Sequence, residues 1–312
     1  MIPGEWTVGS MSDWVVVGVP TSAGAHHAGQ ERAPAALRKA GLIKALRAAG
    51  ESVTDAGDLP GAVFAADPQA TGARNLGAVT RVAGQVADAV AARLETGRLP
   101  LVIGGDCTIT LGVIAGFRRH HPDVGLVYVD GDADLGGALG ADGSGILDST
   151  GVAHLLGRGT PELCGLAGPG PLLEPGRLAL VGGDPRESDD PGRRFLAETG
   201  VSFQEAPALI ADPAGAAARA LAAIAPASGP LVVHFDVDTV DSADLPLANF
   251  PHYGSGVRLS QVVTCLQVLR AAPAFAGLVL TEVNPTHDPG GAQLARYVAA
   301  VAAAIGQPGR PA

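Results

Sequence analysis

The sequence predicts an α/β fold in which helices cover both faces of a mainly parallel sheet. Short apolar runs alternate with Ala- and Leu-rich stretches along all 312 residues, and this order favours parallel strands with helical crossovers. The apolar runs are continuous instead of alternating, which is typical of strands buried on both faces. No internal repeat or linker divides the chain, so we expect a single domain over residues 1–312, with residues 1–12 as a flexible N-terminal extension.

The expected elements follow from these runs and from local start signals. The predicted strands, in chain order, are Trp14–Val19, Leu99–Ile103, Gly125–Val129, Leu178–Val181, Pro230–Phe235 and Leu278–Leu280. The predicted helices are Pro34–Ala48, Asn75–Leu94, Thr108–Arg118, Pro213–Ile224, Ser260–Leu269 and Gly291–Ala304. Pro34 suits a first helical turn, and Ser260 precedes an apolar-periodic run. The stretches Leu135–Thr150 and Asp241–Gly256 are predicted as loops beside a pocket, since both follow acidic strand ends.

Composition limits the class of protein. With 47% hydrophobic and 17% charged residues, the chain can bury one large core. A net charge of −10 argues against nucleic acid or an anionic membrane as partner and is compatible with a cationic small substrate. No apolar run approaches the ~20 residues of a membrane span, and the N-terminus lacks the features of a signal peptide. Three cysteines suit a reducing compartment, so we expect a cytoplasmic protein.

Acidic residues follow two of the predicted strands at the point where each strand ends. One run contains Asp130, Asp132 and Asp134, and the other contains Asp236 and Asp238. Residues i and i+2 of an extended chain point to the same side, and ligands of parallel sheets bind at the carboxyl ends of strands. So many buried carboxylates would repel one another, and a pair of divalent cations removes that objection. The alternative is that these residues cap turns and face water, but two such runs favour a metal site.

Cys107 lies in a third strand end, where Gly104 and Gly105 turn the chain toward a predicted helix. A helix N-terminus lowers the pKa of a thiol, so we expect Cys107 to be a candidate ligand. Cys164 and Cys265 lack such a position and are interpreted as small hydrophobic residues.

Together these motifs resemble the arginase, agmatinase and formimidoylglutamase superfamily of ureohydrolases. That family has Gly-Gly-Asp-His, Asp-Ala-His-x-Asp, Ser-x-Asp-x-Asp-x-x-Asp and Glu-x-Asn-Pro. This chain has GGDC at 104–107, DGDAD at 130–134, HFDVDTVD at 234–241 and EVNP at 282–285, in family order, and residues 18–42 resemble arginase openings. The resemblance spans nearly the whole chain. It implies a three-layer α/β/α fold with a central, mainly parallel eight-stranded sheet.

The resemblance also implies a binuclear metal site. The six implied ligands are Cys107, Asp130, Asp132, Asp134, Asp236 and Asp238. Cys107 and Asp134 would hold one ion, Asp132 and Asp238 the other, while Asp130 and Asp236 would bridge. The family histidines at positions 107 and 132 are absent here, yet every ligand position keeps a metal-capable side chain. We expect two divalent ions, Mn first, with Zn or Fe as competitors because of the thiolate.

The implied activity is hydrolysis of a C–N bond in a guanidino or amidino compound. Asp134 would bind metal and accept a hydrogen bond from the attacking hydroxide. Asp148, at the position of the proton-shuttling His, is the candidate acid or base. Glu282 matches the carboxylate that pairs with a guanidinium.

The substrate positions differ from those of arginases. Ser144 is retained, but Gly136 and Ile146 replace two Asn residues that help hold the amino acid. We therefore expect a substrate other than plain L-arginine, such as a hydroxyguanidine. Asp184 and Glu187 resemble substrate-contacting acids.

Three histidines have two interpretations each. His252 is a candidate for the substrate site and for the missing proton shuttle, although its position in a predicted loop favours an exposed side chain. His154 lies in a predicted helix, where an exposed helix face is likewise the favoured interpretation. His234 is either an additional ligand or a core histidine, and the core interpretation is favoured.

By family analogy we also expect a homo-oligomer, a trimer or hexamer. The alternative function is a catalytically silent relative with a regulatory or structural role.

Overall fold

The computed structural model describes residues 13–70, 72–136, 144–186, 190–224, 229–254 and 256–306. Their strands form one sheet in the order β2-β1-β3-β8-β7-β4-β5-β6, and every neighbouring pair is parallel. The strands are β1 Asp13–Val19, β2 Ser52–Asp58, β3 Leu99–Gly104, β4 Gly125–Val129, β5 Leu178–Val181, β6 Ser202–Gln204, β7 Leu231–Asp236 and β8 Phe275–Thr281. This confirms the predicted eight-stranded parallel sheet.

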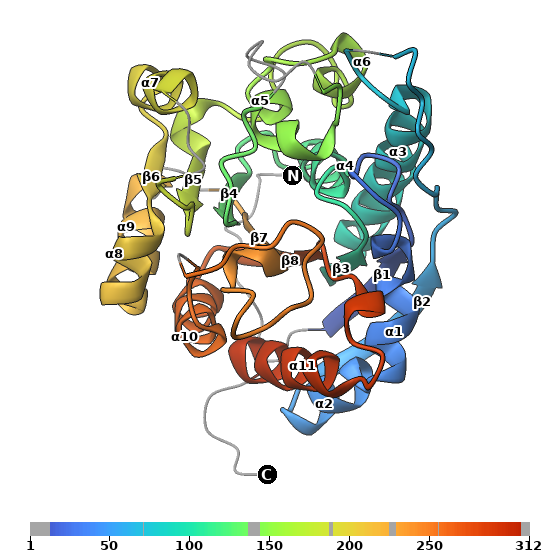
Figure 1. Cartoon of the computed structure of the whole chain (residues 1–312), viewed down its shortest axis with the longest axis vertical. Helices are drawn as coiled ribbons and strands as arrows, with labels where there is room; N and C mark the ends of the chain where they lie inside the picture. Colours follow the sequence, from blue (N-terminus) through green and yellow to red (C-terminus); the bar gives the residue numbers. More distant parts are fainter. Residues whose placement is uncertain are drawn as a thin grey trace.

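Helices cover both faces of the sheet (Figure 1). Helices α3 to α7 pack on one face and α1, α2 and α8 to α11 pack on the other. The α-helices are α1 Ala33–Lys39, α2 Leu42–Ala48, α3 Leu76–Leu94, α4 Ile109–Arg118, α5 Gly151–Leu155, α6 Pro161–Cys164, α7 Asp190–Thr199, α8 Ala206–Ala211, α9 Pro213–Ile224, α10 Leu259–Arg270 and α11 Ala292–Ile305. None of the helices in the described ranges combines the length and hydropathy that a membrane crossing requires.

Each central strand contributes to two separate hydrophobic cores. In β4, Val127 and Val129 pack in the core with α1, α2 and α8 to α11, whereas Leu126 and Tyr128 pack in the core with α3 to α7. Because successive side chains of a strand point to opposite faces, a strand buried on both faces needs an unbroken apolar run. That physical link is why the continuous runs predicted the central strands correctly.

The two edge strands were missed by sequence analysis. β2 is exposed over most of its length and β6 is only partly buried, so neither needs an apolar run. The prediction of one helix over residues 34–48 was also wrong. The chain breaks into α1 and α2 at Gly41, whose φ of 93° lies in the left-handed region that favours glycine.

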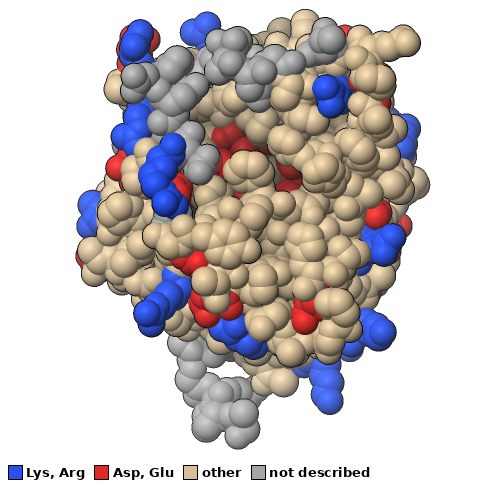
Figure 2. Space-filling model, in the orientation of Figure 1, with Lys and Arg blue, Asp and Glu red and all other residues tan. Residues whose placement is uncertain are grey.

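The parallel arrangement places all carboxyl ends of the strands at one edge of the sheet. The four central strands are β3, β8, β7 and β4, and they are also the strands that the acidic motifs and Cys107 follow. Figure 2 shows that this face is hollowed near its middle and that acidic side chains lie in the hollow.

Candidate metal centre

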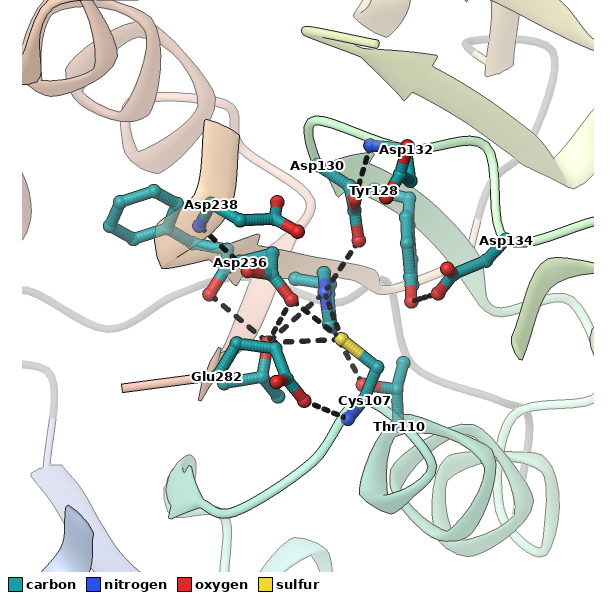
Figure 3. Close-up of polar contacts among 12 residues, drawn as sticks. Cys107, Thr110, Tyr128, Asp130, Asp132, Asp134, Asp236, Asp238 and Glu282 are labelled. Atoms are coloured by element: carbon teal, nitrogen blue, oxygen red, sulfur yellow. Dashed lines mark hydrogen bonds and ion pairs between the residues drawn. The ribbon is translucent and has the colours of Figure 1, made fainter. Parts of the chain in front are cut away.

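Four strands that are neighbours in the sheet deliver the chemistry-bearing side chains. Cys107 follows β3, Glu282 follows β8, Asp236 ends β7 and Asp130 follows β4. Each of these four residues is at least nine-tenths buried. Their side chains point toward one another in Figure 3, so residues up to 175 positions apart in the chain, such as Cys107 and Glu282, share one site.

A first group of possible ligands forms around the Cys107 sulfur. The ligand atoms of Cys107, Asp130, His234 and Asp236 all lie within 4.8 Å of one another. The Cys107 thiol donates to Oδ2 of Asp236 at 2.7 Å. His234 Nε2 lies 3.7 Å from the sulfur and 3.7 Å from Oδ2 of Asp130.

His234 is fully buried inside this group and is firmly oriented. Its Nδ1 lies 2.7 Å from the Thr110 hydroxyl, and its ring stacks on Tyr128 with centroids 3.8 Å apart. Burial lowers the pKa of His234 to about 3, so the ring is neutral and keeps a lone pair. His234 is therefore a core histidine by its burial and a site residue by its position.

A second group contains Asp132, Asp238 and His252, whose ligand atoms also lie within 4.8 Å of one another. His252 Nε2 is 3.7 Å from Oδ2 of Asp132 and 3.9 Å from Oδ2 of Asp238. The prediction that His252 is exposed was wrong, because only 3% of the residue is exposed.

Asp134 lies at the margin of these groups. Tyr128 Oη donates to Oδ2 of Asp134 at 2.5 Å, and Figure 3 shows that the carboxylate meets this hydroxyl beyond the atoms around Cys107. Asp134 has a φ of 47°, which is uncommon for a residue with a side chain. The Tyr128 contact gave no sequence signal, since Tyr128 reads as part of an apolar strand.

Glu282 and Asp148 form a third cluster with Cys107. The Cys107 backbone N–H points to both carboxylates, at 2.8 Å from Oδ1 of Asp148 and 3.0 Å from Oε1 of Glu282. The Gln30 side-chain amide donates to Oε2 of Glu282 at 2.8 Å. Glu282 has a φ of 62°, a strained conformation that its neighbours must hold in place. Gln30 is a site residue that sequence analysis missed.

Burial of so many acids perturbs their titration. Burial, and then repulsion by neighbouring carboxylates, raises the pKa of Asp130, Asp236 and Glu282 well above the ordinary range. Burial, followed by repulsion from Asp132, raises the pKa of Asp238 to about 6. Burial, followed by repulsion from Asp106, raises the pKa of Asp148 to about 8.

The expected lowering of the Cys107 pKa was wrong for the protein without a cation. Burial, and then the charges of Asp236 and Glu282, raise the pKa of this thiol well above its usual value. Helix α4 begins only at Ile109, and burial of the thiol together with the repulsive carboxylates outweighs the effect of the helix terminus on its pKa.

The donor set fits a pair of divalent cations. Carboxylate oxygens are ligands that Mn prefers, imidazole nitrogens suit Zn and Fe, and a thiolate favours Zn and Fe. In the absence of cations, burial opposes ionisation of the Cys107 thiol and of the carboxyls of Asp130, Asp134, Asp236 and Asp238, and so raises their pKa values. Cations would offset both the burial and the mutual repulsion.

The remaining predicted site residues are placed differently. Asp184 is buried, lies 3.8 Å from Nδ1 of His252 and pairs with Arg186 at 3.0 Å. The Ser144 hydroxyl accepts from the Ile146 N–H at 3.1 Å. Glu187 lies outside the described residues.

The prediction that His154 lies on an exposed helix face was wrong. His154 is buried; its Nδ1 lies 2.9 Å from the Thr150 carbonyl and its Nε2 accepts from the Thr160 N–H at 3.0 Å. His154 is therefore a buried histidine whose contacts stabilise the turn after α5.

Comparison with known proteins gives consistent matches over the whole fold. Residues 12–306 match the arginase family. The arginase of Bacillus caldovelox is 28% identical over 278 residues, which cover 88% of this chain and 91% of that protein. Human arginase-1 is 29% identical over 280 residues, covering 87% and 84%.

Solved structures agree with the sequence matches. The structure of the Bacillus caldovelox arginase has a TM-score of 0.85 at 26% identity and covers 95% of this chain and 99% of that one. The formimidoylglutamase of Bacillus subtilis is similar in fold alone, with a TM-score of 0.74 at 16% identity, covering 96% and 88%.

Proposed function

The chain belongs to the arginase family, and from that premise we propose that it is a metallohydrolase cleaving a C–N bond of a guanidino or amidino compound. The observation that carries this proposal is the convergence of buried acids from β4 and β7 with Cys107 from β3 and Glu282 from β8. An acidic hollow of this kind suits both divalent cations and a cationic substrate.

Two divalent ions, with Mn as the first candidate and Zn or Fe as alternatives, would occupy this centre. We propose the ligands Cys107, Asp130, Asp132, Asp134, Asp236 and Asp238. When bound, such ions supply Lewis acidity toward water and toward the substrate. The thiolate of Cys107 is a softer donor than the oxygens and favours Zn or Fe more than an all-oxygen set would.

The role of Glu282 is to bind and orient the guanidinium or amidinium group. Its two oxygens are held by Gln30 and by the Cys107 backbone, and each oxygen retains a further lone pair. Asp148 accepts a hydrogen bond from the Cys107 backbone N–H, the same group that donates to Glu282. We assign Asp148 the proton transfer to the departing amine, so that water adds to the guanidino carbon, the C–N bond breaks and the amine leaves protonated.

The substrate differs from L-arginine in this proposal. Asp184, proposed to bind substrate with Ser144 and Glu187, is already paired with Arg186, which weakens its attraction for a second cation. Ile146 is buried and apolar, and Gly136 has no side chain. A hydroxyguanidine is the substrate that we would test first. A strongly anionic metal centre is a weaker Lewis acid, so it should act best on a substrate whose leaving group or carbon is already activated.

The test combines metal content with product release. Protein purified without chelator should contain, or take up, about two equivalents of Mn. It should release urea or hydroxyurea from at least one member of a panel of L-arginine, N-hydroxy-L-arginine, agmatine and other guanidino compounds. Asp236→Asn should lose metal and activity together, whereas the surface substitution His120→Gln should change neither.

Two results would point elsewhere. A folded, metal-loaded protein that releases no product from the panel supports the silent alternative, which the replacement of the shuttle His by Asp148 favours. Absence of metal uptake by folded protein contradicts the hydrolase proposal. By family analogy we also propose a homo-oligomer, which light scattering tests.

A further inference from the structure

His252 is delivered to the site by the loop between β7 and α10 and does not belong to the six ligand positions proposed above. Its backbone carbonyl accepts from the Ser242 N–H at 2.8 Å, and its ring makes an edge contact with Phe250, with centroids 5.8 Å apart. The residue is 3% exposed. A loop residue held in this way presents its ring in a fixed orientation.

The distances around Nε2 suit a shared cation better than direct contact. Nε2 is 3.7 Å from Oδ2 of Asp132 and 3.9 Å from Oδ2 of Asp238. Hydrogen bonds between N–H groups and oxygens are shorter, about 2.7–3.2 Å. Two ligand atoms with bonds of about 2.0–2.2 Å to one ion lie about 3.3–3.8 Å apart when the angle between the bonds is about 110–120°, as in a tetrahedral ion or in the equatorial plane of a five-coordinate ion. The three atoms are therefore spaced as ligands of one ion, with a small inward movement.

Gly131 makes the approach of His252 possible. A Cβ atom at this position would lie 3.0 Å from Nε2 of His252 and 2.9 Å from the Asp238 carbonyl oxygen. Such contacts are too close for an unperturbed structure. The family pattern described above has Ala here, so this chain combines a missing side chain at 131 with an imidazole in the vacated space.

The other ring nitrogen also faces a carboxylate. Nδ1 lies 3.8 Å from Oδ2 of the buried Asp184. Metal-bound histidines are commonly oriented by a carboxylate on the side away from the ion. Asp184 is on that side of the ring, while Asp132 and Asp238 are on the other.

We propose that His252 is a ligand of the ion held by Asp132 and Asp238, in place of the substrate contact expected from the sequence. This inference rests on the proposed function, because it requires the binuclear centre. It gives the second ion an imidazole from a different segment of the chain than the one that carries Asp132. Within the proposed centre, the second ion would be bound by three side chains in addition to the bridging acids.

The test is pulsed EPR spectroscopy of the wild-type protein loaded with Mn alone. A directly bound imidazole gives nitrogen modulation of the Mn signal, which changes when the protein is labelled with 15N-histidine. We expect this modulation to decrease in His252→Gln and to persist in His120→Gln, a control at an exposed position. In Mn titrations, His252→Gln should weaken binding of one equivalent by at least about 10-fold, because loss of a residue that merely orients a metal ligand already costs about 10- to 100-fold.

A second variant covers the case in which His252→Gln does not fold. Gly131→Ala keeps the imidazole but crowds Nε2, so it should reduce the nitrogen modulation as well. Mn-loaded wild-type protein without nitrogen modulation overturns the inference and leaves the proposed function standing. Modulation that is unchanged in folded His252→Gln has the same meaning. Folded wild-type protein that takes up no Mn overturns both.

Discussion

Removal of metal should invert the pH dependence that acidic proteins usually show. Asp238 and Asp148 have pKa values raised from 3.8 to about 6 and about 8, in both cases first by burial. A carboxyl whose pKa is higher in the folded state stabilises the fold below its unfolded pKa. This stabilisation is lost as pH rises through the folded pKa. The metal-free protein should therefore be more stable at pH 5 than at pH 8.

The magnitude follows from the two pKa shifts. Between pH 5 and 6, the contribution of Asp238 to the free energy of unfolding falls by roughly 1 kcal/mol, at about 1.4 kcal/mol per pH unit. Asp148 titrates over the whole range from pH 5 to 8 and would lose roughly 4 kcal/mol, which we halve because its side chain is partly exposed. These two losses sum to about 3 kcal/mol. The buried neutral ring of His234, whose pKa is lowered to about 3, opposes them, because its folded form gains roughly 2 kcal/mol of stability between pH 5 and its unfolded pKa of about 6.5. The net loss from these three groups is about 1 kcal/mol, and the raised pKa values of Asp130, Asp236 and Glu282 act in the same direction as Asp148. For 312 residues, an unfolding entropy of about 2.1 cal/mol/K per residue converts the net loss of about 1 kcal/mol into a Tm decrease of roughly 2 °C.

Thermal unfolding with a chelator at pH 5, 6, 7 and 8 provides the assay. The Tm of the metal-free protein should fall across this series, and Mn should remove the fall because cations stabilise the ionised carboxylates. The double variant Asp148→Asn/Asp238→Asn should have a flatter profile. A metal-free Tm that stays constant or rises from pH 5 to 8 would refute the argument that these acids are buried without compensation.

Three further predictions concern single contacts. Tyr128→Phe removes the donor to the buried Asp134 and should lower the free energy of unfolding by about 1.5–3 kcal/mol in urea denaturation; a loss below about 0.5 kcal/mol would contradict the importance of this contact. Gln30→Ala frees one oxygen of Glu282 and should raise KM for a guanidino substrate by roughly 10-fold, since about 1.4 kcal/mol of orientation is lost; an unchanged KM argues against Glu282 as the guanidinium partner. Cys107→Ala should reduce bound metal from about two equivalents toward one in elemental analysis; retention of both ions would show that the sulfur is not a ligand.

The sequence contained enough information for the sheet and for the positions of the acids. Strands buried on both faces require unbroken apolar runs, and residues at the ends of neighbouring parallel strands must meet. Asp130 and Asp236 could be brought together on those grounds alone. β2 could not be predicted, because an edge strand is stabilised by pairing with β1 and needs few apolar side chains.

The histidines show where sequence reasoning stops. A loop position made exposure of His252 the favoured interpretation, yet the ring is buried because Gly131, more than a hundred positions away, leaves room for it. The burial of His154 and the contact between Gln30 and Glu282 likewise depend on how distant segments pack. Local pattern contains no information about such neighbours.

Charge balance connects the site with its proposed substrate. Five aspartates and a thiolate carry six negative charges against four from two divalent ions, whereas His234 and His252 add donor atoms without charge. The excess of two negative charges holds the cations firmly and weakens them as Lewis acids. A centre of this kind should favour substrates whose leaving group or carbon is already activated. Between a hydroxyguanidine and the matching guanidine, kcat should therefore differ more than KM, with the higher kcat for the hydroxyguanidine. A difference that lies mainly in KM would show that binding alone sets the preference.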